Sequence, residues 1–234
     1  MKRMTDRETV TRAIETAVDY AKHNIDLSRC YYGQHHGDGK FYDRPFTYYF
    51  FLAGFVAQLR YSRILEIGTH FGGSIFSMAR GIEHAGLRQS GEIVTVDLRD
   101  RNSKQFRANP RVKRILGDCF DERVVREVSS SFTEHIDLMF IDAEHSYEFT
   151  KRCFEQYLPL VRPKIVIFDD IHLNPSMESL WQELAAKHGE HAIDITTRCR
   201  QPAGFGLLIS REDLGKGLRA VSDLKHVRII SLTT

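Results

Sequence analysis

The sequence has few of the features that mark several large classes of protein. Only four of its 234 residues are cysteine (Cys30, Cys119, Cys153 and Cys199), and none of them forms a CxxC pair. This favours reduced thiols in a cytosolic protein over a disulfide framework or a zinc site. Excess charge is also missing, because 33 Lys and Arg stand against 31 Asp and Glu, a net charge of +2. We therefore expect no nucleic-acid or anionic-membrane partner.

Long apolar segments are absent as well. Residues 1–10 lack the apolar run of roughly 7 to 15 residues that a signal peptide requires. The most apolar window, residues 46–59, is interrupted by Thr47, Gly54 and Gln58 and is shorter than the roughly 20 residues of a spanning helix. We expect a cytoplasmic protein in which residues 46–59 form a buried helix. With 42% apolar residues, the chain is too hydrophobic for a disordered protein.

From Arg63 onward, short apolar runs alternate with helical stretches, which is typical of βαβ units in a parallel sheet. The predicted strands are Arg63–Gly68, Glu92–Leu98, Val112–Gly117, Ile136–Asp142, Lys164–Asp169, Ala192–Thr197 and Phe205–Ser210. No helix is expected between the last two, so they should pair antiparallel at one sheet edge. We predict an α/β fold with a doubly wound, seven-stranded, mostly parallel sheet, a terminal antiparallel hairpin and an N-terminal helical extension.

The chain divides into three expected parts: residues 1–62, the core at residues 63–210, and residues 211–234. Thr5-Asp6-Arg7-Glu8 matches a capping box and opens an amphipathic helix. Residues 31–42 combine glycines with Tyr and His and form either a surface connection or a cap over the substrate. The last part is an added edge strand or an oligomer contact, so a homo-oligomer stays open.

Polar residues follow the first three predicted strands, where ligands bind in such sheets. The first is followed by a glycine-bearing turn that contains Glu66, Gly68, Thr69, His70, Gly72 and Ser74, without the G-x-G-x-x-G spacing of dinucleotide sites. Asp97 follows the second strand, at the position where an acidic side chain accepts hydrogen bonds from ribose hydroxyls, and Asp118-Cys119 follows the third. There are two structural alternatives: the glycines serve tight packing of the turn, and Asp118 caps a helix. The three acids Glu66, Asp97 and Asp118 at successive strand ends together favour a nucleoside ligand.

The fourth and fifth strand ends carry Asp142 with His145, and the pair Asp169-Asp170. If these strands are neighbours, about 4.8 Å apart, the carboxylates converge and repel one another unless a proton or a cation intervenes. Oxygen ligands suit Mg²⁺. His145 would lean over the same site with a nitrogen free for proton transfer. The alternative is that both acids cap the segments that follow them.

These residues resemble the class I S-adenosylmethionine-dependent methyltransferases, over about residues 63–210. In that superfamily, the turn at Glu66–Ser74 holds the methionine part of the cofactor, Asp97 matches the ribose-binding acid, and Asp118-Cys119 flanks the adenine. The resemblance also implies a Rossmann-like fold and places Asp142 beside the cofactor. The terminal hairpin distinguishes this fold from the dinucleotide-binding Rossmann sheet.

Within the superfamily, the chain resembles the divalent-metal-dependent O-methyltransferases. The catechol and caffeoyl-CoA enzymes use an Asp, then an Asp-Asn pair, and a Lys base. Here Asp142, Asp169-Asp170 and His145 stand in those places, which looks more like the macrocin O-methyltransferase and cephalosporin-hydroxylase-like branch. The resemblance implies metal ligands at Asp142, Asp169 and Asp170, and His145 as the base.

The predicted function is Mg²⁺-dependent methyl transfer from S-adenosylmethionine to a hydroxyl of a small molecule, such as a sugar, a natural-product alcohol or a phenol. Two alternatives are an NAD(P)-dependent oxidoreductase on a Rossmann sheet and a noncatalytic cofactor-binding protein.

Overall fold

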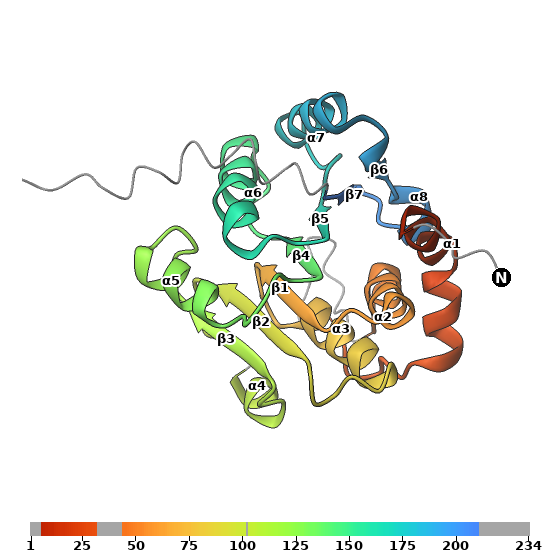
Figure 1. Cartoon of the computed structure of the whole chain (residues 1–234), viewed down its shortest axis with the longest axis vertical. Coiled ribbons are helices and arrows are strands. Elements are labelled where there is room, and N and C mark those ends of the chain that lie inside the picture. The colour runs from red at the N-terminus through yellow and green to blue at the C-terminus, as the bar shows by residue number, and fades with distance from the viewer. Residues whose placement is uncertain (1–5, 32–43, 102, 211–234) are drawn as a thin grey trace, which may run out of the picture.

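The computed structural model describes residues 6–31, 44–101 and 103–210, and these form a central sheet covered by helices on both faces (Figure 1). The strands are β1 (Arg63–Ile67), β2 (Glu92–Asp97), β3 (Val112–Leu116), β4 (Leu138–Ile141), β5 (Ile165–Asp169), β6 (Ala192–Asp194) and β7 (Phe205–Ile209). The helices are α1 (Asp6–Asn24), α2 (Thr47–Leu59), α3 (Gly73–His84), α4 (Ser103–Ala108), α5 (Glu122–Ser130), α6 (Tyr147–Val161), α7 (Pro175–His188) and α8 (Thr196–Cys199), with a 3₁₀ turn η1 (Gly189–His191).

The sheet has the order β3-β2-β1-β4-β5-β7-β6. Strands β1 to β5 are parallel, whereas β7 runs antiparallel to both β5 and β6. The predicted fold class is therefore confirmed, including the antiparallel pair at one edge.

The connection between the last two strands differs from the prediction. Strand β6 ends at Asp194, and the one-turn helix α8 follows where we expected only a short loop. The Asp194 carboxylate accepts a hydrogen bond from the Thr196 N–H at 2.9 Å and turns the chain out of the strand. One turn of helix then buries Ile195 and Cys199 on the same side. This local turn overrides the apolar pattern that had favoured a longer strand.

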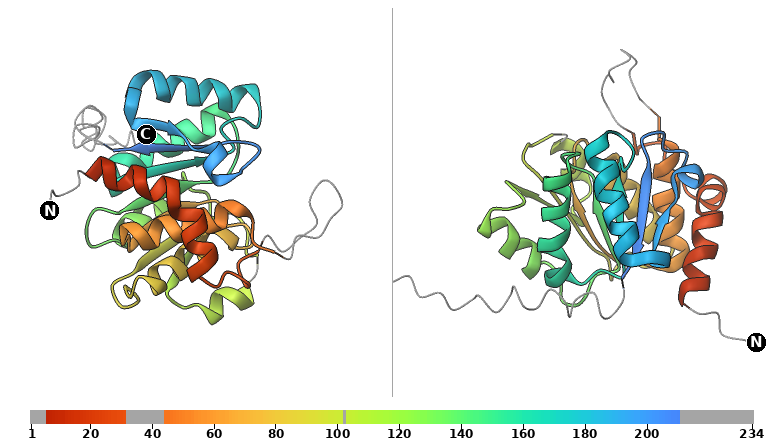
Figure 2. Two further views of the ribbon diagram at one scale, coloured as in Figure 1. Left: turned by 90° about the vertical axis from the view of Figure 1, so that its right-hand side faces the viewer. Right: turned by 90° about the horizontal axis from the view of Figure 1, so that it is seen from above.

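Alternate residues of each strand face opposite helical layers. Ile64 of β1 belongs to a core with α1, α2 and α3, whereas Leu65 belongs to a core with α5, α6 and α7. Seen from above, the red and orange helices α1 and α2 lie on one side of the sheet, and the teal and cyan helices α6 and α7 lie on the other (Figure 2, right). The predicted buried helix at 46–59 is thus α2, which packs between α1 and the sheet.

Strand register decides which side chains meet at the carboxyl edge. Ile67 pairs with Ile141, and Ile141 pairs with Phe168. Gly68, Asp142 and Asp169 are the next residues of three adjacent strands or strand ends, so they lie side by side at this edge.

Three expectations lie outside the described residues: the Thr5 end of the capping box, most of the Tyr- and His-rich segment (32–43), and residues 211–234. The division into three parts stays a prediction. Among the helices of the described ranges, none has both the length and the apolar character needed to cross a bilayer.

Candidate active site

The turn after β1 is shaped by close backbone contact with β4. Gly68 has a φ of +102°, and a Cβ there would lie 1.7 Å from the carbonyl oxygen of Asp142. Only glycine tolerates both conditions. His70, also at positive φ (48°), donates its backbone N–H to Asp97 Oδ2 at 2.7 Å. The turn is therefore fixed to the end of β2, and α3 starts directly behind it.

Glu66 lies beneath this turn and is fully buried. Its carboxyl oxygens accept hydrogen bonds from the hydroxyls of Ser74 and Thr95, both at 2.5 Å. Burial raises the pKa of Glu66 to about 8, against the hydrogen bonds from the two hydroxyls, which lower it. Glu66 therefore holds Ser74 in place from behind and lines neither of the two cavities described next.

A cavity of about 410 Å³ opens at the ends of β1, β2 and β3. Asp97 stands on its wall with Oδ1 accepting the Arg99 N–H at 2.8 Å, and each carboxylate oxygen keeps lone pairs for a further donor. Asp118 accepts the Phe120 N–H at 2.8 Å. Asp118 does not cap α5, because Asp121 is its N-cap. This cavity, called the nucleoside pocket below, combines apolar walls with acids at its edge.

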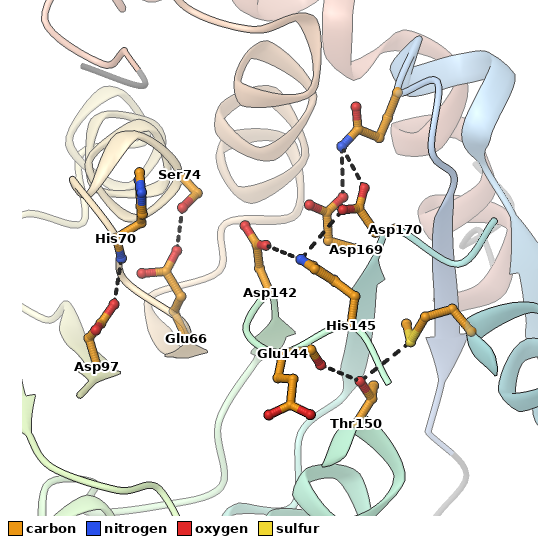
Figure 3. Close-up of polar contacts among 12 residues, drawn as sticks. Glu66, His70, Ser74, Asp97, Asp142, Glu144, His145, Thr150, Asp169 and Asp170 are labelled. Atoms are coloured by element: carbon orange, nitrogen blue, oxygen red, sulfur yellow. Dashed lines mark hydrogen bonds and ion pairs between the residues drawn. The ribbon is translucent and has the colours of Figure 1, made fainter. Parts of the chain in front are cut away.

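A second cavity of about 600 Å³, called the acidic cavity, adjoins it and shares His70, Asp142 and Ala143. Here His145 Nε2 lies 3.4 Å from Asp170 Oδ2 and 3.9 Å from Asp142 Oδ1 (Figure 3). His145 immediately precedes Ser146, the N-cap of α6, and Asn174 Nδ2 donates to its carbonyl oxygen at 3.0 Å. The histidine thus stands between the carboxylates of two neighbouring strands.

The carboxyl groups of Asp142 and Asp169 interact closely enough that each changes the pKa of the other, so the pair keeps a shared proton when no cation is bound. Burial, together with the charge of Asp170, raises the pKa of Asp142 to about 8. Burial and the charges of both neighbouring acids raise the pKa of Asp169 well above its usual range. Neither Asp142 nor Asp169 pairs with a Lys or Arg of the described ranges. A cation in place of the shared proton would remove this electrostatic cost.

Eleven of the predicted site residues line the two cavities. Gly68, Asp97, Asp118 and Cys119 line the nucleoside pocket; Thr69, Ser74, His145, Asp169 and Asp170 line the acidic cavity; His70 and Asp142 line both. Glu66 and Gly72 line neither. Gly72 is the N-cap of α3.

Sequence reasoning missed two contributors to the acidic cavity. Gln201 donates from Nε2 to Asp169 Oδ1 at 3.0 Å and to Asp170 Oδ1 at 3.3 Å. Tyr49 of α2 also lines the cavity, and a Cβ on Gly73 would lie 2.4 Å from its hydroxyl oxygen. The antiparallel direction of β7 was a usable signal for Gln201, because the segment before β7 returns to the edge where β5 ends.

The donor set of the acidic cavity fits a hard divalent cation in its chemistry. Asp142, Asp169 and Asp170 offer carboxylate oxygens, the ligands that Mg²⁺ prefers. Within the part of the chain that the structure describes, no three His, Cys, Asp or Glu side chains are already arranged as a metal site. Binding would therefore require the shared proton to leave and the carboxylates to turn toward the ion.

Comparison with known proteins points to the same class. The central part of the chain, from β1 to the end of β5, matches a family model described as a methyltransferase domain. The match covers residues 65–171, a little under half of the chain. A curated protein of Sinorhizobium fredii, the uncharacterized protein y4gI, is 28% identical over 185 residues, which is 70% of this chain and 19% of that protein. The chain thus spans about a fifth of the length of this relative.

Solved structures share the fold around the methyltransferase domain. The O-methyltransferase TomG of Streptomyces achromogenes, in complex with S-adenosylmethionine, has 20% identity and a TM-score of 0.58, over 89% of this chain and 100% of that one. An O-methyltransferase of Bacillus cereus, with S-adenosylhomocysteine, has 21% identity and a TM-score of 0.51, over 89% and 93%. The match to a methyltransferase domain agrees with the expected class of S-adenosylmethionine-dependent methyltransferases, and the two solved structures show that the chain shares their fold.

Proposed function

We propose that this protein methylates a hydroxyl oxygen of a small molecule, with His145 as the base and a divalent cation, Mg²⁺, held by Asp142, Asp169 and Asp170. The observation that carries the proposal is the position of His145, whose Nε2 lies 3.4 Å from Asp170 Oδ2 inside the cavity that adjoins the nucleoside pocket. A basic nitrogen and a set of carboxylates thus face the same space.

The nucleoside pocket and the turn after β1 would hold S-adenosylmethionine, which supplies an electrophilic methyl group when bound. Asp97 would accept hydrogen bonds from the ribose hydroxyls, while Asp118 and Cys119 would border the adenine. Thr69, His70 and Ser74 line the acidic cavity beside the shared wall and would take the methionine part. Burial lowers the pKa of His70 to about 4, so this histidine adds no charge next to the cofactor at neutral pH.

The acceptor would enter the acidic cavity, whose wall includes Phe46, Tyr48 and Phe71. His145 would take the hydroxyl proton, held in place by the Asn174 contact to its backbone and by the carboxylates on either side. The deprotonated oxygen would then attack the methyl carbon in line from roughly 3–3.5 Å, and the bond from that carbon to sulfur would break, with S-adenosylhomocysteine as the leaving group. The carboxylates stabilise the imidazolium that forms.

Energetics explain why a cation accompanies the base. With water's pKa of about 15.7 as a stand-in for an alcohol and about 6.5 for an ordinary imidazole, proton transfer costs roughly 12 kcal/mol, whereas a phenol near 10 costs roughly 5 kcal/mol. A bound Mg²⁺ supplies Lewis acidity that lowers the pKa of a coordinated hydroxyl. An aliphatic acceptor therefore needs the cation far more than a phenol does.

The test combines ligand binding with turnover. Thermal unfolding is measured with S-adenosylhomocysteine, Mg²⁺ and a chelator, and a panel of sugars, alcohols and catechols is then screened for methylation. We expect stabilisation by the cofactor product and metal-dependent methylation of at least one hydroxyl compound. Cofactor binding without any Mg²⁺ effect or product would instead favour the noncatalytic alternative, and stabilisation by NADH alone would refute the methyltransferase assignment.

Two variants separate the roles. His145→Gln should lower turnover by about 100-fold or more and leave the affinity for S-adenosylhomocysteine within about twofold, while the control His135→Gln, at an exposed site beside Arg162, should change neither. Asp169→Asn should abolish the methylation activity that depends on Mg²⁺. Loss of cofactor binding in His145→Gln, or unchanged chelator sensitivity in Asp169→Asn, would contradict these roles.

A further inference from the structure

A third cavity lies between α3, α4 and the segment that follows α1. Its volume is about 800 Å³, and it shares no lining residue with the nucleoside pocket or the acidic cavity. The proposed methyl transfer makes no use of this cavity, which is within the usual size range of ligand sites.

The charge on its wall is strongly one-sided. Five cationic side chains line it, Arg29, Arg80, Arg88, Lys104 and Arg111, against the single carboxylate of Glu83. They come from the segment after α1, from α3, from the α3–β2 connection, from α4 and from the α4–β3 connection. The fold therefore gathers these charges from distant parts of the sequence.

Three of the arginines are joined by a chain of contacts. Glu83 Oε2 pairs with Arg80 Nη1 at 2.9 Å, and Glu83 Oε1 pairs with Arg88 Nη1 at 3.3 Å. Arg111 Nη1 donates to the backbone carbonyl of Arg88 at 3.3 Å, which satisfies one donor but neutralises no charge. One carboxylate thus pairs with two guanidinium groups, and the charge of Arg111 beside them has no ion-pair partner among the described residues.

The opposite wall adds further positive charge. The Arg29 carbonyl accepts a hydrogen bond from Gln105 Nε2 at 3.1 Å, which ties this segment to α4. Neither Arg29 nor Lys104 forms an ion pair with a carboxylate of the described ranges. The nearby acid Asp26 is exposed and accepts the Ser28 N–H at 2.9 Å. This hydrogen bond lowers the pKa of Asp26, and the charges of Arg80 and Arg29 contribute to the lowering. Even with Asp26 counted, the five cations of the cavity face two carboxylates among the described residues.

We propose that this cavity binds a phosphorylated small molecule through its phosphate groups. Like charges held close together repel one another, and an oxyanion between them converts that repulsion into attraction. Guanidinium groups suit phosphate because they present paired donors in one plane. S-adenosylmethionine carries no phosphate, so this ligand is a second one and the site is independent of the methyl-transfer proposal.

The experiment is calorimetric titration of the full chain with inorganic pyrophosphate at low ionic strength. The double variant Lys104→Gln/Arg111→Gln removes two exposed charges from the cavity. The matched control Arg126→Gln/Lys187→Gln removes one Arg and one Lys from exposed positions on α5 and α7. We expect one saturable site whose affinity falls at least about tenfold in the cavity variant and less than about twofold in the control. A second cavity variant, Arg29→Gln/Arg88→Gln, should weaken binding similarly.

Three results would overturn the proposal. The first is the absence of saturable pyrophosphate binding by the unmodified chain. The second is equal weakening in the cavity and control variants, which would show a general effect of net charge. The third is unchanged affinity in both cavity variants, which would place the anion elsewhere.

Discussion

The buried carboxyl of Glu66 makes the stability of the fold depend on pH in a specific direction. Glu66 is fully buried, and its two oxygens accept hydrogen bonds from the hydroxyls of Ser74 and Thr95. Burial raises its pKa from the ordinary 4.5 to about 8. Replacement by Gln keeps the size and the acceptor oxygen but removes the ionisation, so Glu66→Gln isolates this effect.

The sign follows from proton linkage. Below about pH 4.5 both folded and unfolded chains carry the Glu66 proton; between 4.5 and about 8 only the folded chain does. Ionisation of the unfolded chain therefore lowers the free energy of unfolding as pH rises through this interval, and the loss is complete above about 8. At about 1.36 kcal/mol per pKa unit, the interval corresponds to about 5 kcal/mol.

Urea unfolding of the wild type and of Glu66→Gln between pH 5 and 9 measures this effect, because other titrating groups largely cancel in the difference. The stability of the wild type relative to the variant should fall with rising pH by several kcal/mol, at no more than about 1.4 kcal/mol per pH unit. A difference that is flat or rises with pH would show that Glu66 is already ionised in the folded chain, and the reasoning from burial would be wrong.

The remaining predictions concern the packing of the sheet edges. Gly68→Ala should cost more than about 3 kcal/mol of stability or prevent folding, because its Cβ would lie 1.7 Å from the Asp142 carbonyl oxygen. The control Gly86→Ala, at positive φ with nothing within 4 Å of the added Cβ, should cost about 1 kcal/mol. Equal urea midpoints for the two variants would refute the steric argument. Asp137→Asn should destabilise the fold by about 2–3 kcal/mol at pH 7, because Asp137 accepts from Lys164 Nζ and two backbone N–H groups. These contacts outweigh burial and lower the Asp137 pKa, so its stabilisation should be lost only as pH falls below about 3.8. Unfolding of the wild type and of Asp137→Asn, followed by circular dichroism, should therefore show a stability difference at pH 7 that disappears in acid.

Sequence periodicity was sufficient for the architecture because buried parallel strands carry continuous apolar runs. β5, for example, is buried at every residue from Ile165 to Asp169, and its predicted start at Lys164 is off by one position. At the start of α7, Asn174 is the N-cap and Pro175 lies in the first turn, a local pattern that is typical of helix starts. Strand ends were harder to predict. Strand β6 ends where the Asp194 side chain accepts a hydrogen bond from the Thr196 N–H, and the spacing of apolar residues carries no information about such a contact.

The candidate site was predictable where its residues directly follow parallel strands. Asp142 and Asp169 meet because β4 and β5 are neighbours in register, which was the condition on which their convergence was predicted. Tyr49 and Gln201 were not predictable in this way, because they reach the cavity from a helix across one face and from an antiparallel return. Residues that depend on how distant elements pack have no local signal in one sequence.

Backbone conformation supplies an independent reason to place chemistry at this edge. Of the five non-glycine residues with positive φ in the described ranges, Arg60, Arg162 and Arg200 end helices, whereas His70 and Asp170 do not. His70 follows β1 and Asp170 follows β5, and both line the acidic cavity. Such conformations cost about 1–3 kcal/mol each and persist where the surroundings fix them: Asp97 binds the His70 N–H, and Gln201 binds the Asp170 carboxylate. The strained backbone therefore lies at two positions that the proposed reaction uses. His70 belongs to the turn that would hold the cofactor, and Asp170 presents its carboxylate to His145.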